Sequence, residues 1–155
     1  MLYFAYGSNL NLADLNRWCR EKKERGDFLE FYSTGVLRDF TARFTLLSEV
    51  RSGGVLDVVP KRGSEVPGVL FTVASADGWR LLDLKEGVPN HYERADVDVA
   101  VRGGGIINAI TYSVAAHRRQ DHVVPHQHYV DVVCEGLKEW ALGDAHILSA
   151  AQDVT

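Results

Sequence analysis

Residues 3–10 read YFAYGSNL, an apolar run that ends in a Gly-Ser-Asn turn just before the expected start of a helix. The run over residues 2–6 indicates a short buried strand. Asn11, followed three residues later by Asp14, has the spacing of a helix capping box. A strand that passes into a helix in this way leaves backbone N–H groups unpaired, which suits an anion or an oxyanion, and Gly7 would let a ligand come close. Gly-Ser-Asn is also a common turn composition, so a second motif is needed to distinguish a site from a turn.

Hydrophobic periodicity along the rest of the chain alternates between the strand and the helix pattern. Strand patterns separated by Arg-Asp, Ser-Gly-Gly and Gly-Ser turn signals predict strands over residues 28–36, 40–47, 54–59 and 66–73. Two later strands are predicted over 92–101 and 106–114, joined across a triple glycine. Helical spacing and cap residues predict helices over 11–24, 75–86, 129–140 and 145–151. The sum is an α+β fold, and a sheet this long in a chain this small is expected to curl into a partial barrel.

Composition excludes several classes of protein. The 155 residues are 46% hydrophobic, which fits a single domain over residues 1–155 with a real core. A net charge of -4 with scattered basic residues argues against a nucleic-acid partner. The apolar runs are shorter than the roughly 20 residues of a membrane helix, and no basic leader precedes the first strand. We therefore expect no membrane partner and a cytoplasmic location, with Cys19 and Cys134 as reduced core thiols.

The second motif is LLDLKEGVPNHYER, residues 81–94. On a helix that begins near Ser75, the spacing of Trp79, Leu82 and Glu86 places Glu86 on the apolar stripe. Burial and the helix C-terminus should both raise the pKa of this carboxyl group toward a proton-transfer range. The alternative is a glutamate that reaches solvent or pairs with Lys85 or Arg94.

Five segments together make the chain resemble the γ-glutamylcyclotransferases and their AIG2-like relatives. They are YFAYGSNL at 3–10, GGVLDVV at 53–59, VPGVLFTV at 66–73, LLDLKEGVPNHYER at 81–94 and VPHQHYVDVVCEGLKEWAL at 124–142. The resemblance covers nearly the whole chain and implies a small mixed β-barrel with flanking helices. It also implies that Glu86 is the general acid/base. The substrate-binding loop that it implies consists of Tyr6, Gly7, Ser8, Asn9 and Leu10.

The implied reaction is an intramolecular cyclisation that needs neither metal nor cofactor. The α-amine of a γ-glutamyl group attacks its own side-chain carbonyl, which forms 5-oxoproline and releases an amine or a peptide. One carboxylate with a raised pKa can serve both proton transfers, which makes Glu86 the candidate. Backbone N–H groups of residues 7–9 can stabilise the oxyanion, so Ser8 is not needed as a nucleophile. The expected partner is a small γ-glutamyl molecule, the expected assembly is a monomer or a homodimer, and the released amine stays open.

Two tyrosines are further candidates for the substrate site. Many relatives carry Gly and an aromatic residue after the Glu-Gly pair, whereas this chain has Asn90, His91 and Tyr92 in a shorter loop. Strand parity places Tyr92 on the polar face with Arg94, so we expect it to reach a pocket only if a bulge turns it inward. Tyr129 begins the apolar stripe of the long helix, where it is either a core residue or a site residue.

A histidine-rich segment raises the question of a metal. His117, His122, His126 and His128 lie close in sequence. Residues two apart at a helix start point to different sides, and no cysteine or acid cluster completes a ligand set, so no metal is expected. The loop is instead expected to border the mouth of the site, with Arg118 and Arg119 available for an acidic part of the leaving group.

Two function classes stay open at the level of sequence. One is the cyclotransferase, and the other is a non-catalytic AIG2-like module that binds a small γ-glutamyl or carboxylate ligand. A binding module has no need of a carboxylate on an apolar stripe, because burying it is unfavourable. Glu86 therefore favours the enzyme.

Overall fold

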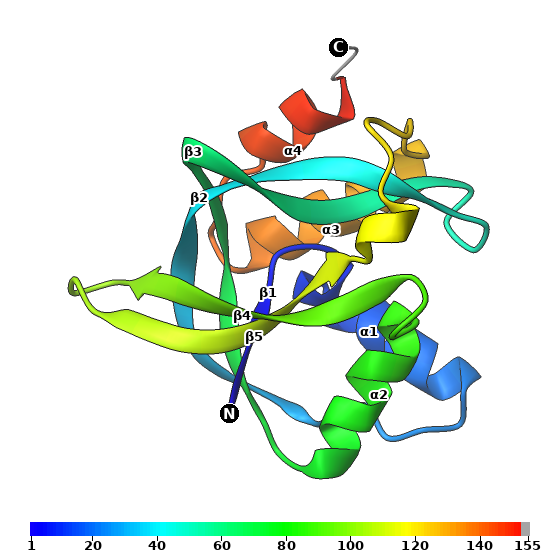
Figure 1. The fold of residues 1–155 in the computed structure, drawn as a ribbon. Helices are drawn as coiled ribbons and strands as arrows, with labels where there is room; N and C mark the ends of the chain where they lie inside the picture. Colours follow the sequence, from blue (N-terminus) through cyan, green and yellow to red (C-terminus); the bar gives the residue numbers. More distant parts are fainter. Residues whose placement is uncertain (153–155) are drawn as a thin grey trace.

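The chain folds into a closed β-barrel with helices packed around it, as the computed structural model of residues 1–152 shows (Figure 1). The strands are β1 (Leu2–Ala5), β2 (Leu29–Ser48), β3 (Gly53–Val73), β4 (Tyr92–Val101) and β5 (Ile106–Val114). Their order around the barrel is β1-β3-β2-β4-β5. β1 pairs in parallel with β5, whereas β1–β3, β2–β3, β2–β4 and β4–β5 are antiparallel. The α+β mixed barrel expected from the sequence is confirmed, and it is closed rather than partial.

The middle of the sheet differs from the expected four short strands, because β2 and β3 are two long bent strands. The Arg-Asp and Gly-Ser signals mark irregularities within one ladder instead of ends of strands. Asp39 has a φ of 62° and Gly63 a φ of 85°. The Gly63 N–H donates to Asp39 Oδ1 at 2.9 Å, and the register shifts between Arg38 and Phe40. A bulge of this kind bends a strand without ending its pairing, which lets the sheet close.

Four α-helices flank the barrel: α1 (Leu12–Glu21), α2 (Ala76–Glu86), α3 (Gln127–Glu139) and α4 (Ala145–Ala151). Two short 3-10 turns, η1 (Ser8–Leu10) and η2 (Ala116–Arg118), were not predicted. The predicted N-caps are confirmed, since Asn11 accepts from the Asp14 N–H and Ser75 accepts from the Gly78 N–H. α1 ends at Glu21 rather than at residue 24, because Lys23 takes a left-handed φ of 58° and turns the chain.

The packing of α3 fixes the chain directly after β1. A Cβ added at Gly136 would lie 2.8 Å from the Asn11 nitrogen and 2.9 Å from the Leu10 carbonyl carbon, so α3 touches the backbone of η1. Asn11 Nδ2 donates to the Val132 carbonyl at 3.0 Å, and Trp140 Nε1 donates to the Leu10 carbonyl at 2.9 Å. The loop after β1 is therefore held from the α3 side by backbone contact and two hydrogen bonds.

Two further expectations concern the state of the cysteines and the presence of a membrane helix. Cys19 is buried, Cys134 is partly buried, and both are free thiols. None of the helices within residues 1–152 has the length and apolarity that crossing a membrane requires.

Candidate active site

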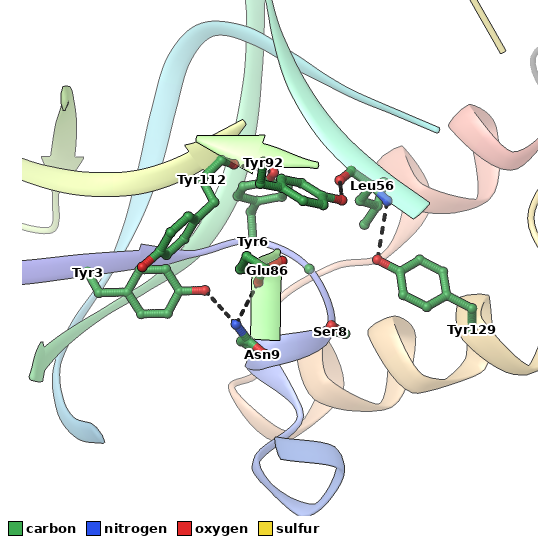
Figure 2. Close-up of a pocket in the computed structure, with 10 residues that line it drawn as sticks. Tyr3, Tyr6, Ser8, Asn9, Leu56, Glu86, Tyr92, Tyr112 and Tyr129 are labelled. Atoms are coloured by element: carbon green, nitrogen blue, oxygen red, sulfur yellow. Dashed lines mark hydrogen bonds between the residues drawn. The ribbon is translucent and has the colours of Figure 1, made fainter. Parts of the chain in front are cut away.

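A pocket lies where β1, β3, β4, β5, α2 and α3 meet (Figure 2). Its lining brings together both sequence motifs, which are residues 6–9, called here the YGSN loop, and the end of α2. The predicted site residues that line it are Tyr6, Gly7, Ser8, Asn9, Glu86, Tyr92 and Tyr129. Tyr3, Leu56 and Tyr112 also line it and were not predicted.

The YGSN loop presents its backbone to this pocket. The N–H groups of Gly7, Ser8 and Asn9 have no acceptor among residues 1–152, whereas the next two amides close the η1 turn. Gly7 has a φ of -125°, outside the positive range that favours glycine. A Cβ there would lie 3.6 Å from Leu56 Cδ1 and 3.8 Å from Tyr129 Oη, both lining the pocket. Unpaired amides beside open space can bind an oxyanion.

Glu86 ends α2 with its carboxylate in the pocket. Its Oε1 accepts from Asn9 Nδ2 at 2.9 Å, so the two motifs touch directly (Figure 2). Burial raises the pKa of Glu86, against the charges of Lys85 and Arg51 and the Asn9 hydrogen bond, which all favour the carboxylate. The pKa of Glu86 is therefore raised, as expected for a carboxyl group on the apolar side of α2.

The partners suggested for Glu86 are engaged elsewhere. The Arg94 guanidinium binds Asp83 through two hydrogen bonds of 2.9 and 2.8 Å. Lys85 Nζ lies 2.6 Å from Asn9 Oδ1, and its side chain is only 7% exposed. Within residues 1–152, Glu86 therefore has no ion pair at hydrogen-bond distance, and its carboxylate stays available to the pocket.

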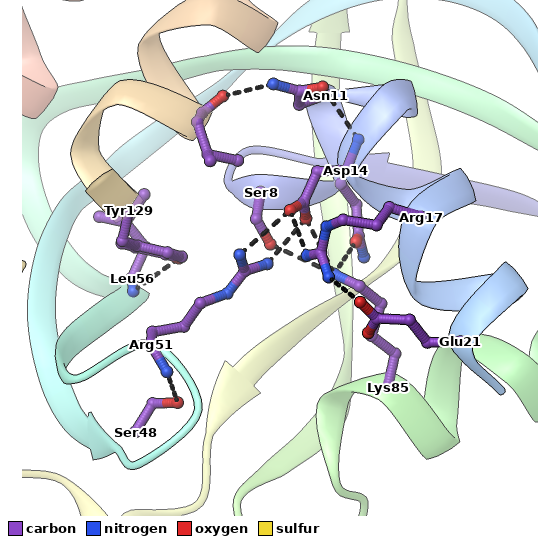
Figure 3. Close-up of polar contacts among 12 residues, drawn as sticks. Ser8, Asn11, Asp14, Arg17, Glu21, Ser48, Arg51, Leu56, Lys85 and Tyr129 are labelled. Carbon is purple, nitrogen blue, oxygen red and sulfur yellow. Dashed lines mark hydrogen bonds and ion pairs between the residues drawn. The ribbon is translucent and has the colours of Figure 1, made fainter.

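Next to Lys85, the side chains of Asp14, Arg17 and Arg51 form a charged cluster (Figure 3). Asp14 accepts from Arg17 at 2.8 Å and from Arg51 at 3.1 and 2.7 Å. Burial would raise the pKa of Asp14, but these hydrogen bonds lower it to about 2. The Arg51 guanidinium also lies 5.3 Å from the centre of the Tyr129 ring. Asp14 thus joins α1 to the β2–β3 turn beside the pocket, instead of completing the capping box.

Four tyrosine hydroxyls give the pocket a defined pattern of donors and acceptors. Tyr6 donates to the Tyr112 carbonyl and Tyr92 donates to the Leu56 carbonyl, both at 2.5 Å. Their oxygens can then only accept from a ligand.

The other two hydroxyls have the opposite arrangement. Tyr129 accepts from the Leu56 N–H at 3.2 Å, and Tyr3 accepts from Asn9 Nδ2 at 2.9 Å. Neither hydroxyl has an acceptor within residues 1–152, so both can donate to a ligand. Burial raises the pKa of Tyr129 to about 12, which keeps it a neutral donor at ordinary pH.

Tyr92 lines the pocket although no bulge turns it inward. It pairs with Val114 in an unbroken β4–β5 register, which places it on the face of Arg94 and Tyr112 as expected. Arg94 is exposed although it binds Asp83 of α2, whereas Tyr92 is buried and donates to the Leu56 carbonyl of β3. The doubt about Tyr92 was wrong because the first residue of β4 is buried in the pocket wall, although Arg94, Asp96 and Asp98 further along the same face are exposed.

Two predicted roles do not fit the pocket. Leu10 is fully buried in the core and is absent from the pocket lining. Arg119 is not available to a leaving group, since its Nε donates to the buried Asp57 at 2.7 Å and its Nη2 donates to the Val114 carbonyl at 3.1 Å. Arg118 is exposed, and its role in binding a leaving group stays a prediction. Within residues 1–152, no group of three metal-ligating side chains comes together.

Known proteins resemble this chain in sequence and in fold. A family model described as Gamma-glutamyl cyclotransferase, AIG2-like matches residues 3–131. The chain is 32% identical over 143 residues to the gamma-glutamylcyclotransferase of Bos taurus, covering 89% of this chain and 70% of that protein. The identity to the Homo sapiens protein of the same name is 29% with the same coverage. A solved structure named gamma-glutamyl cyclotransferase has a TM-score of 0.80 and 26% identity, covering 99% of this chain and 88% of that one. This chain therefore belongs to the gamma-glutamyl cyclotransferase, AIG2-like family.

Proposed function

We propose that this protein converts a γ-glutamyl amine or peptide into 5-oxoproline and the free amine, with Glu86 as the general acid/base. One observation carries the proposal. The Glu86 carboxylate and the Asn9 amide lie 77 residues apart in sequence and 2.9 Å apart in one pocket, beside the unpaired amides of the YGSN loop. Family membership supports the reaction class.

Glu86 is suited to both proton transfers of this reaction. The substrate's α-ammonium must lose a proton before its nitrogen can attack the γ-carbonyl carbon, and a buried carboxylate can accept that proton. The new C–N bond closes the ring, and the bond from the same carbon to the leaving nitrogen breaks. The lactam nitrogen keeps one of the three ammonium protons, and the other two depart with the released amine as its ammonium. Glu86 therefore ends each cycle as it began.

The YGSN loop is suited to stabilise the charge that develops on the γ-carbonyl oxygen. We assign the oxyanion to the N–H groups of residues 7–9 and to the Tyr129 hydroxyl, where one fixed donor contributes about 3 kcal/mol. Ser8 Oγ accepts from Lys85 Nζ at 3.4 Å, so this contact does not draw a proton from the hydroxyl. Ser8 thus acts as a loop residue and not as a covalent nucleophile. Tyr6 and Tyr92 present acceptors that suit the ammonium.

The setting of the reaction is part of the proposal. Two free cysteines fit a reducing compartment, so we place the activity in the cytoplasm. The pocket serves a small molecule.

The experiment incubates the protein with a panel of γ-glutamyl amino acids, γ-glutamyl-lysine isomers and γ-glutamyl amines, and follows 5-oxoproline by mass spectrometry. Glu86→Gln keeps an oxygen that accepts from Asn9, so we expect it to fold and bind product while turnover falls at least about a hundredfold. Near-normal turnover would remove Glu86 from the mechanism. Product binding without turnover of any panel member by the wild-type protein would favour the non-catalytic binding module.

A further inference from the structure

We propose that Lys85 is a positioning residue for this reaction: its ammonium holds the Asn9 carbonyl oxygen, so that the Asn9 NH2 group faces Glu86. The inference rests on the proposed function for its catalytic consequence and on the geometry alone for the orientation of Asn9. Lys85 and Glu86 are neighbours at the end of α2, and they contact opposite ends of the same amide.

The chemistry of the three groups permits one orientation of the amide. An ammonium has only donors, so the atom of Asn9 that lies 2.6 Å from Lys85 Nζ must be the oxygen. The NH2 group then points the other way and donates to Tyr3 Oη and Glu86 Oε1, both at 2.9 Å. Both of its hydrogens are used. Without Lys85, a rotated amide would present its oxygen to a carboxylate, which is repulsive unless Glu86 is protonated.

The burial of Lys85 argues that the amide is its main partner. Its side chain is 7% exposed, and a buried ammonium needs a strong acceptor. The nearest carboxylate oxygen in an ion pair with it, Asp14 Oδ2, lies 3.9 Å away and already accepts from Arg51 at 2.7 Å. Asn9 Oδ1 is much closer, at 2.6 Å. Figure 3 shows the Lys85 side chain reaching from α2 toward the η1 turn.

The contact between Lys85 and Asn9 matters for proton transfer because both residues act on the Glu86 carboxylate. Lys85 and Arg51 are the cations that act on its carboxylate, and Asn9 donates to it. The other titratable groups that interact with it are the hydroxyls of tyrosines from β1, the YGSN loop, β4 and α3, which are neutral at ordinary pH. Removing Lys85 takes away one cation and releases the amide, and both changes favour the protonated form of Glu86.

The orientation is tested first in the wild-type protein by NMR. The Asn9 side-chain NH2 resonances, assigned by their loss in Asn9→Ala, should show NOEs to the Tyr3 ring and to the Glu86 Hγ protons. NOEs from this NH2 group to the Lys85 Hε protons in place of those would overturn the proposal without any variant of Lys85.

The catalytic consequence is tested with Lys85→Met, Lys85→Arg and the control Arg17→Met. Arg17 belongs to the same charged cluster and binds Asp14 rather than Asn9, so Arg17→Met removes a cation without changing a contact of Asn9. We expect kcat of Lys85→Met to fall on the order of tenfold to a hundredfold, with the acid limb of kcat/KM moved to higher pH. Lys85→Arg, which is also a donor-only cation, should keep the wild-type limb, as should Arg17→Met. A structural role alone would lower the melting temperature and leave the acid limb in place.

The outcomes separate this inference from the proposed function. A folded Lys85→Met with wild-type kcat and acid limb refutes the positioning role even if the enzyme is a cyclotransferase. If the wild-type protein forms no 5-oxoproline, the proposed function fails, and the NOEs still decide whether Lys85 orients Asn9. If Lys85→Met does not fold, the NOEs and the pH profile of Lys85→Arg decide.

Discussion

Replacing Gly7 by alanine tests whether the substrate binds directly against the backbone of the YGSN loop. The added Cβ would lie 3.6 Å from Leu56 Cδ1 and 3.8 Å from Tyr129 Oη, which are ordinary van der Waals contacts. Its φ of -125° lies outside the positive range that favours glycine. We therefore expect the free energy of unfolding to stay within about 1 kcal/mol of wild type.

The expected effect on catalysis is much larger. A substrate oxygen that accepts from the loop amides and from Tyr129 must lie about 3 Å from each donor. The new methyl group, 3.8 Å from that hydroxyl, occupies the same region. A displacement of the reacting carbonyl by about 1 Å costs on the order of a hundredfold in kcat/KM, or about 3 kcal/mol.

The assay measures 5-oxoproline formation by mass spectrometry, 5-oxoproline affinity by calorimetry and the melting temperature on one preparation. Gly143→Ala is the matched control, since a Cβ there meets nothing within 4 Å, and all three readouts should stay unchanged. A folded Gly7→Ala with wild-type kcat/KM and product affinity would refute the role of the loop backbone and leave YGSN as a simple turn.

Two further predictions concern the groups around the pocket. Tyr129→Phe keeps the ring contacts but removes the acceptor of the Leu56 N–H, so we expect the free energy of unfolding to fall by about 1 kcal/mol. We also expect kcat to fall about tenfold or more because an oxyanion donor is lost. An unchanged kcat would exclude this hydroxyl from the oxyanion site. The pKa of Asp14 is lowered from 3.8 to about 2 on folding, so its ionisation stabilises the protein by about 2 kcal/mol above pH 4, and this is lost as the pH falls toward 2. Urea unfolding should show the difference between wild type and Asp14→Asn shrinking over that range, and a constant difference would contradict the assignment.

The sequence by itself determined the features that depend on neighbouring residues. The caps at Asn11 and Ser75 and the glycine stop at Gly87 follow from local hydrogen bonds and backbone angles, so α2 ends at Glu86 as predicted. β4 and β5 have the predicted bounds because a glycine-rich turn separates two clear alternations. The two motifs were also visible, since each is a short continuous stretch.

Tertiary structure alone decided which groups meet and which faces are covered. The sequence left Tyr92 on a polar face, and only the tertiary packing buried this one residue of the face in the wall of a pocket. The contact between Lys85 and Asn9 joins residues that are 76 positions apart in sequence, and Arg119 binds Asp57, which is 62 positions away. The physical reason is that periodicity reports the side to which a residue points. What lies on that side, and hence its burial, partner and pKa, depends on atoms that only the closed barrel brings together.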